Sequence, residues 1–217
     1  MMKNWFKQLG WVMALVGGLA LVSACNDSGG DSGSTPKDFG DNDPGLVVAM
    51  GDSITEGQCV PAGAPWPSRL AGLSGKGVIN EGRCGERSAG GASRIAGVLS
   101  RTKPGYVLIN YGANDAIYGH TSGTLTYHIR VMIQAAKANN TVPLVGTVLP
   151  MYDSHAFAAD KVPEYNAAIK QVCKEEGVRV VDVNKEFGNE RSFLQGDGLH
   201  PSDSGNQLIA LSFNDKL

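Results

Sequence analysis

The sequence predicts an α/β fold, a three-layer α/β/α sandwich built around a five-stranded parallel sheet. Two observations predict it. Apolar runs that read as strands alternate along the chain with longer stretches in which apolar residues recur near helical spacing. The strand-like runs also lack strict alternation of apolar and polar residues, which is typical of strands covered on both faces. We expect one domain, residues 46–217, because no internal repeat divides this part of the chain.

The expected elements alternate from the first to the last. The five strands are Leu46–Met50, Gly77–Asn80, Tyr106–Tyr111, Val142–Leu149 and Val178–Val183. The five helices are Trp66–Leu73, Gly90–Arg101, Leu125–Asn139, Val162–Gly177 and Ser202–Phe213. Helical spacing is clearest at Ile95, Val98 and Leu99. Asn139 and Gly177 stand where helices commonly end, since Asn and Gly tolerate the left-handed conformation.

Residues 1–24 are expected to be an export signal and not part of the fold. Lys3 and Lys7 give a basic start, and the apolar run Trp11–Val22 is too short to span a membrane comfortably. The run Leu21–Cys25 resembles the lipobox of bacterial lipoproteins, in which the cysteine is diacylated and becomes the mature amino terminus. An ordinary secretory signal that is cleaved nearby is the alternative.

Residues 25–45 are expected to be a flexible tether, because their many Gly, Ser and Asp residues cannot bury apolar surface. The protein would then be exported and held at the cell envelope by a lipid on Cys25, with its folded domain in the periplasm or outside the cell. The net charge is −2, and removing the signal takes away two lysines and no acids. Nucleic-acid binding needs a basic face, so we expect none.

Polar residues that could take part in catalysis follow the predicted strands, at the edge where open parallel sheets bind ligands. Ser53 follows the first strand within Gly-Asp-Ser-Ile-Thr, and Asp197 and His200 follow the fifth within Asp-Gly-Leu-His-Pro. A serine nucleophile needs an imidazole to take its proton, and the imidazole needs a carboxylate to orient it. Ser53, His200 and Asp197 would fill these roles. The alternative for the last loop is an ordinary helix entry with Asp197 as a cap.

Together with Gly-Ala-Asn-Asp after the third strand, these blocks resemble the SGNH, or GDSL, family of serine esterases and lipases, which has a flavodoxin-like sandwich. The glycine of the family's second block best matches Gly85, although Gly82 competes with it. The resemblance implies an oxyanion hole made by the backbone amides of Ser53 and Gly85 and the side-chain amide of Asn114.

By resemblance, the reaction is hydrolysis of a carboxylic ester through an acyl-enzyme on Ser53, with no cofactor. The compact multifunctional esterases imply short or medium acyl, aryl or lysophospholipid-like substrates. A carbohydrate O-acetylesterase is the first alternative, because the loop from Cys59 to Trp66 departs from that group. A silent lipoprotein that binds glycan or lipid is the second. Tyr111, Met151 and Tyr152 are expected to contact substrate, but local packing explains such residues equally well.

The sequence gives weaker indications of function for the histidines other than His200. His120 and His155 lie in predicted loops, where they would either line the cleft or be solvated, and His128 reads as a surface or packed residue of a helix. Neither His-Glu-x-x-His, Cys-x-x-Cys nor calcium-loop spacing occurs in the sequence. We therefore expect no metal site.

The cysteines bear on the compartment and on the oxyanion loop. Cys59 lies six residues after Ser53, and Cys84 directly precedes Gly85, so the fold should bring these two loops together. We expect a disulfide between Cys59 and Cys84 that pins one loop to the other in an oxidising compartment. Two free thiols are the alternative. Cys173 reads as a buried helix residue.

Overall fold

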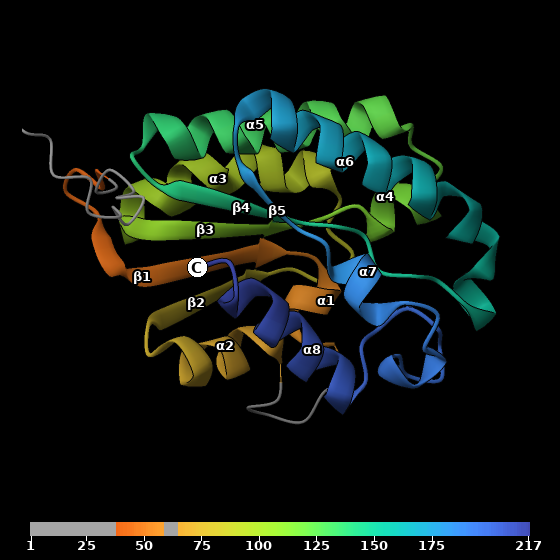
Figure 1. The fold of residues 1–217 in the computed structure, drawn as a ribbon. Helices are drawn as coiled ribbons and strands as arrows, with labels where there is room; N and C mark the ends of the chain where they lie inside the picture. Colours follow the sequence, from red (N-terminus) through yellow and green to blue (C-terminus); the bar gives the residue numbers. More distant parts are fainter. Residues whose placement is uncertain (1–37, 59–64) are drawn as a thin grey trace, which may run out of the picture. The chain divides into compact units, whose positions relative to one another are not determined.

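The computed structural model describes residues 38–58 and 65–217, so the predicted export signal, Cys25 and Cys59 lie outside the described residues. The predicted five-stranded parallel sheet is confirmed, with strand order β2-β1-β3-β4-β5. Figure 1 shows helices on both faces of this sheet, as expected for the α/β/α sandwich. The strands are β1 (Asp43–Gly51), β2 (Gly77–Gly82), β3 (Pro104–Asn110), β4 (Val142–Gly146) and β5 (Arg179–Val181).

Five long helices match the predicted ones to within a few residues. One face of the sheet is covered by α3 (Ser88–Thr102), α5 (Ser122–Ala138) and α6 (Val162–Glu176), and the other by α2 (Trp66–Ser74) and α8 (Asp203–Asn214) (Figure 1). The remaining elements were not predicted, because three to five residues are too few to show a helical period and the longer η1 is a 3₁₀ helix, which lacks the α-helical period. They are α1 (Ser53–Glu56), α4 (Ala113–Ile117), α7 (Val183–Phe187), η1 (Asp153–Lys161) and η2 (Arg191–Phe193).

The centre of the sheet is formed by β1 and β3, which are buried on both sides. Residues 47–51 of β1 and the whole of β3 are buried. Gly51 pairs in register with both Gly82 of β2 and Asn110 of β3, so these three strands end at the same level. The strand order reverses at β1, and ligands of open α/β sheets bind at such a reversal. The loops that carry Ser53, Gly85 and Asn114 therefore begin side by side.

The helix layer formed by α2 and α8 also holds the loop that carries His200. Trp66 at the start of α2 stacks on Phe213 of α8, with 4.9 Å between ring centroids. The backbone N–H of Trp66 donates to Asn206 Oδ1 at 3.0 Å, and Asn206 Nδ2 donates to the carbonyl oxygen of Pro201 at 3.1 Å. Helices α2 and α8 and the end of the histidine loop are thus joined by packing and by hydrogen bonds.

Gly82→Ala tests how β2 is joined to the nucleophile turn. A Cβ at Gly82 would lie 2.1 Å from the backbone nitrogen of Glu56 in α1. Backbone cannot move aside easily, so we expect urea unfolding to show a loss of about 1–3 kcal/mol. Gly97→Ala in α3 is the matched control, because a Cβ there meets nothing within 4 Å and Ala favours helix. Equal stability of the two variants would contradict the tight contact at Gly82.

Candidate active site

The turn from β1 into α1 presents Ser53, and each residue of Gly-Asp-Ser has a local reason. A Cβ at Gly51 would lie 2.0 Å from Thr55 Oγ1 and 2.8 Å from the carbonyl oxygen of Asn110, so only glycine fits. The Asp52 carboxylate accepts the backbone N–H of Ile54 at 3.0 Å and caps α1. Ser53 is therefore the first helical residue, held directly above the end of the central strand.

Three residues from distant parts of the chain form one hydrogen-bonded series. His200 Nε2 lies 2.9 Å from Ser53 Oγ, and His200 Nδ1 lies 2.5 Å from Asp197 Oδ2. With Nδ1 donating to the carboxylate, Nε2 is left to accept the serine proton. Ser53 is 6% exposed and the His200 side chain 14% exposed, so the series is shielded but reachable. The structure thus brings together the three residues predicted to act as a triad.

Asp197 is held in its ionised form. Burial alone would raise the pKa of its carboxyl, but hydrogen bonds outweigh burial and hold the pKa below its usual value. These bonds come from the His200 ring and from the backbone amides of Leu199 and His200, at 3.0 and 3.1 Å. A carboxylate in this state stabilises the imidazolium that forms when His200 takes a proton.

A tight hairpin positions Asp197 and His200. Gln195 donates its backbone N–H to the carbonyl oxygen of His200 at 2.7 Å, which closes the hairpin. Gly198 has φ +73°, and a Cβ on it would lie 2.2 Å from the carbonyl oxygen of Tyr152. The backbone N–H of Tyr152 donates in turn to the carbonyl oxygen of Gly198 at 2.9 Å. The hairpin therefore rests on the segment after β4, and Gly198 is required there.

The two glycines that compete for the oxyanion position have different surroundings. Gly82 packs against the backbone of α1, as described above. Gly85 is exposed with φ +71°, and a Cβ there would meet nothing within 4 Å. Gly85 is therefore not packed against the rest of the fold as Gly82 is, and its oxyanion role stays a prediction. Asn114, in the first turn of α4, donates from Nδ2 to the carbonyl oxygen of Glu86 at 3.1 Å.

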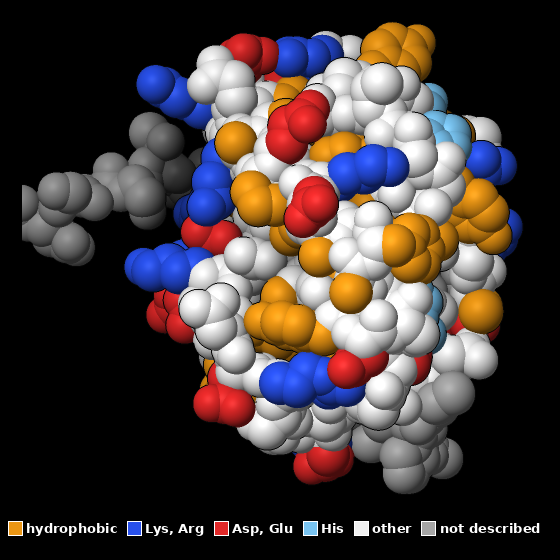
Figure 2. Space-filling view, turned by 90° about the vertical axis from the view of Figure 1, so that its right-hand side faces the viewer, with side chains coloured by type: hydrophobic (Ala, Val, Ile, Leu, Met, Phe, Trp, Pro, Cys, Tyr) orange, Lys and Arg blue, Asp and Glu red, His pale blue; other side chains and the backbone are white. Residues whose placement is uncertain are grey.

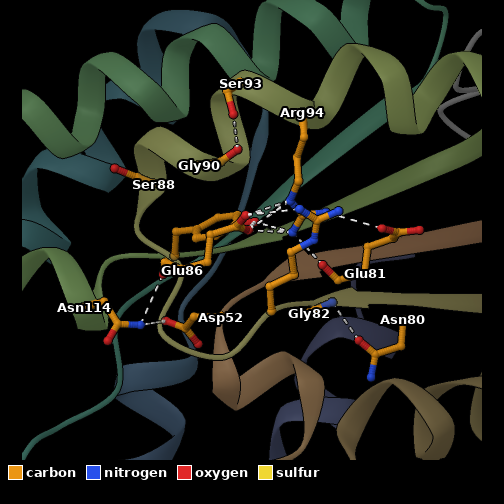
Figure 3. A network of polar contacts seen from close by, with 12 residues as sticks. Asp52, Asn80, Glu81, Gly82, Glu86, Ser88, Gly90, Ser93, Arg94 and Asn114 are labelled. Carbon is orange, nitrogen blue, oxygen red and sulfur yellow. Dashed lines mark hydrogen bonds and ion pairs between the residues drawn. The ribbon is translucent and has the colours of Figure 1, made fainter.

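Asp52 is a further ionisable group of the site, and its role was not predicted from the sequence. It is 1% exposed, and its Oδ2 lies 3.5 Å from Asn114 Nδ2 (Figure 3). Burial raises the pKa of this carboxyl to about 7, with a further upward push from Asp115 and a downward one from the Ile54 amide. The sequence showed no signal for this role, because the short helix α1 that Asp52 caps was itself not predicted.

Two of the three predicted substrate contacts need correction. Tyr111 is 2% exposed, and its hydroxyl donates to Glu86 Oε2 at 2.7 Å and accepts from Arg94 at 2.9 Å. Met151 is 3% exposed and belongs to the core. Both side chains are turned into the fold, so neither forms the rim of the site. Tyr152 is partly exposed and stays a predicted contact.

The other histidines support the loops around the site. His155 Nδ1 lies 2.9 Å from the carbonyl oxygen of Asp197, so its ring holds the triad hairpin. His120 Nε2 lies 3.0 Å from an Arg87 nitrogen. His128 Nδ1 lies 3.0 Å from Ser88 Oγ, which agrees with its interpretation as a packed helix residue.

The predicted disulfide is not seen in the structure. Cys84 is a free, exposed thiol, and its expected partner Cys59 lies outside the described residues. The bridge therefore stays a prediction. Cys173 is buried as expected, and its burial raises the pKa of the thiol to about 12, which leaves it protonated and inert.

Figure 2 shows the face of the molecule at the carboxyl ends of the strands. Apolar side chains form several separate groups on it, with Lys, Arg, Asp and Glu between them. Two of the large exposed hydrophobic residues belong to the loops at these strand ends, Tyr118 at 65% exposure and Phe157 at 68%. Within residues 38–58 and 65–217, no group of three His, Cys, Asp or Glu side chains could hold a metal ion.

Asp52 makes stability depend on pH in a defined direction. Its pKa in the fold, about 7, lies above its usual value of 3.8, so the fold favours the neutral carboxyl. The stability that the neutral Asp52 carboxyl contributes is fully present below pH 3.8 and is lost as pH rises through the folded-state pKa of about 7. Asp52→Asn keeps the capping oxygen but cannot ionise. We expect its free energy of unfolding to improve relative to wild type between about pH 4 and about pH 7. Parallel pH curves from urea unfolding would exclude this account.

Three comparisons with known proteins agree with this geometry. The sequence model of the GDSL-like lipase/acylhydrolase family matches residues 49–208. The chain is 32% identical to an arylesterase of Vibrio mimicus over 172 residues, which are 76% of this chain and 84% of that one. It is 27% identical to thioesterase 1/protease 1/lysophospholipase L1 of Escherichia coli K12 over 168 residues, 76% and 79% of the two chains.

Among solved structures, a protein of the G-D-S-L family from Desulfitobacterium hafniense superimposes with a TM-score of 0.71 at 26% identity. The match covers 79% of this chain and 99% of that one. The strand order, the turn that presents Ser53 and the family match all lead to the same conclusion: this chain belongs to the GDSL-like lipase/acylhydrolase family.

Proposed function

We propose that this carboxylic ester hydrolase acts through an acyl-enzyme on Ser53. The observation that carries the proposal is the unbroken hydrogen-bonded series from Ser53 through His200 to Asp197 at the end of β1. A serine hydroxyl in such a series can give up its proton as it attacks a carbonyl carbon. A molecule that only binds glycan or lipid would have no need of this alignment.

The reaction proceeds in two halves. As Ser53 Oγ bonds to the carbonyl carbon, its proton passes to His200 Nε2, and the carbonyl oxygen becomes negatively charged. The backbone amides of Ser53 and Gly85 and the side-chain amide of Asn114 stabilise that charge. The tetrahedral intermediate collapses, and His200 gives its proton to the departing alcohol. Water then repeats the sequence on the acyl-enzyme, which releases the acid and restores Ser53.

Short or medium acyl, aryl or lysophospholipid-like esters are the proposed substrates. Relatives bear the names arylesterase and thioesterase/lysophospholipase. Tyr118 and Phe157 offer exposed rings near the site, and Arg87 lies over the Tyr118 ring at 5.4 Å. Such rings suit an apolar acyl chain or an aryl leaving group. An O-acetylated carbohydrate is the substrate that a competing acetylesterase function would require.

Ser53→Ala is expected to lower kcat on p-nitrophenyl acetate by roughly 10³-fold or more, because no oxygen remains to form the acyl-enzyme. His200→Ala should have a similar effect. Ser212→Ala in α8 is the matched control, since its hydroxyl donates to the carbonyl oxygen of Leu208 in the same helix at 2.8 Å. Circular dichroism establishes that each variant folds.

The substrate class is tested by measuring hydrolysis rates on a panel of esters. The panel contains p-nitrophenyl esters of increasing acyl length, phenyl acetate, a lysophospholipid and acetylated xylo-oligosaccharides. Preference for the acetylated sugars would favour the carbohydrate acetylesterase. Wild type and Ser53→Ala that are equally inactive on the whole panel would leave only the binding function.

We also propose that the protein is exported and anchored to the cell envelope by a lipid on Cys25. The support is the basic, apolar and small-residue order before Cys25, followed by a Gly-, Ser- and Asp-rich segment. The part of the chain that the structure describes contains no helix long and apolar enough to cross a membrane.

Cys25→Ser tests the anchor in a bacterial host. Wild type should take up labelled fatty acid and sediment with membranes, since two or more acyl chains bind a bilayer stably. The variant should lose the label and leave the membrane fraction. Equal labelling of both proteins would contradict lipidation at Cys25.

A further inference from the structure

Glu86 links the two oxyanion donors that lie outside the nucleophile turn. It directly follows Gly85, and its carbonyl oxygen accepts the hydrogen bond from Asn114 Nδ2 at 3.1 Å. Its backbone N–H donates to the carbonyl oxygen of Arg83 at 3.1 Å, which closes the turn around Gly85. Any shift of Glu86 would therefore displace the backbone of Gly85 and the amide of Asn114 together.

The carboxylate of Glu86 points away from Asn114 and is clamped from two sides (Figure 3). Arg94 binds both of its oxygens, with Nε at 2.9 Å from Oε1 and a terminal nitrogen at 2.6 Å from Oε2. Tyr111 donates its hydroxyl to Oε2 at 2.7 Å. The side chains of Glu86 and Arg94 are 12% and 10% exposed, so water competes little for these bonds. A two-point contact of a guanidinium with a carboxylate fixes direction as well as distance.

The clamp is itself tied to the rigid sandwich. Arg94 projects from α3, and its terminal nitrogens also donate to the carbonyl oxygen of Glu81 at 2.6 Å and to the Glu81 carboxylate at 3.3 Å. Glu81 belongs to β2, and Tyr111 directly follows β3. The Tyr111 ring also lies where a Cβ on Gly91 would fall, 2.6 Å from its nearest carbon. Two strands and one helix thus hold the Glu86 carboxylate in place.

The loop that carries Gly85 has little packing of its own. Arg83, Cys84 and Gly85 are all exposed, and a Cβ on Gly85 would meet no atom within 4 Å. At its start, the Arg83 N–H donates to the carbonyl oxygen of Gly51 at 3.0 Å. Its far end is held at Glu86. The position of the Gly85 amide therefore depends on that anchor.

We propose that Glu86 is a positioning residue for the ester hydrolysis, and that Arg94 and Tyr111 hold its carboxylate so that the Gly85 and Asn114 amides stand ready for the oxyanion. The inference rests on the proposed function of Ser53. Donors stabilise developing charge best when they need no rearrangement at the moment of reaction. A loosened anchor should therefore weaken binding of the transition state and leave binding of the ester ground state nearly unchanged.

Glu86→Gln tests the anchor, because it keeps the shape of the side chain and removes the charge that binds Arg94. We expect kcat on p-nitrophenyl acetate to fall about ten- to hundredfold, less than the loss of a whole donor, with KM within about twofold of wild type. Affinity for a short alkylboronic acid, whose adduct on Ser53 imitates the tetrahedral intermediate, should fall in parallel. Arg94→Lys and Tyr111→Phe should give smaller losses of the same kind, and they carry the test if Glu86→Gln does not fold.

Glu176→Gln is the matched control. Glu176 of α6 is also 12% exposed, and it also binds two cationic side chains, Arg130 at 2.7 Å and Lys137 at 2.9 Å. Those partners lie on α5 and not at the site. This variant should lose some thermal stability and keep the kcat and the boronate affinity of wild type.

A double-mutant cycle with Asn114→Ala gives the decisive comparison. If Glu86 acts through the donors, Glu86→Gln should cost less in kcat when Asn114 is already absent, because part of what it positions has gone. An equal loss in both backgrounds, or an unchanged boronate affinity, would overturn the positioning role and leave a structural one. If Ser53→Ala is inactive while all three clamp variants keep full kcat, this inference alone fails. Activity that survives in Ser53→Ala would instead refute the proposed function.

Discussion

The turn from β1 into α1 is the constraint on which the site depends. Parallel strands deliver their loops to one edge, but only a sharp turn at the end of a central strand leaves a serine facing that edge. Gly51 allows the close approach to Thr55, and Asp52 supplies the cap that begins α1. A larger residue at Gly51 would move the start of the helix, and with it the oxygen that His200 must reach. The rest of the site is arranged around the position of Ser53.

The two sides of the site reach Ser53 by different means. The histidine side is a closed hairpin, in which Gly198 fits against Tyr152 and His155 binds the carbonyl oxygen of Asp197. Local hydrogen bonds between residues 195 and 200 close this hairpin, and contacts with the segment after β4 hold it in place. The proposed oxyanion side is an exposed loop that ends at Glu86. The carboxylate of Glu86 is held by Arg94 of α3, which also binds Glu81 of β2. Acid–base geometry and charge stabilisation are thus secured by separate parts of the fold.

The sequence predicted what depends on periodicity and on short motifs. Strand and helix alternation led to the sheet and the five long helices, and the four blocks led to Ser53, Gly85, Asn114, Asp197 and His200. The clamp was not predicted, because Glu86 and Arg94 are eight residues apart and meet only after α3 packs on the sheet against β1. Tyr111 was misplaced for a related reason. The sequence does not tell whether an aromatic residue after a strand faces solvent or the interior. Tyr111 faces the interior because Gly91 has no side chain and leaves room for its ring.

Buried acids near a developing oxyanion pose an electrostatic problem that this structure solves in two ways. A negative charge inside the fold would oppose the charge that forms on the substrate oxygen, because a low dielectric screens it weakly. Burial raises the pKa of Asp52 to about 7, which disfavours its ionised form, and the carboxylate of Glu86 pairs with Arg94 at 2.6 Å. Both acids contact Asn114, one through its carboxyl and the other through its backbone. Less negative charge around Asn114 favours the proposed oxyanion role of its amide, and the residues that order this amide also determine the charge around it.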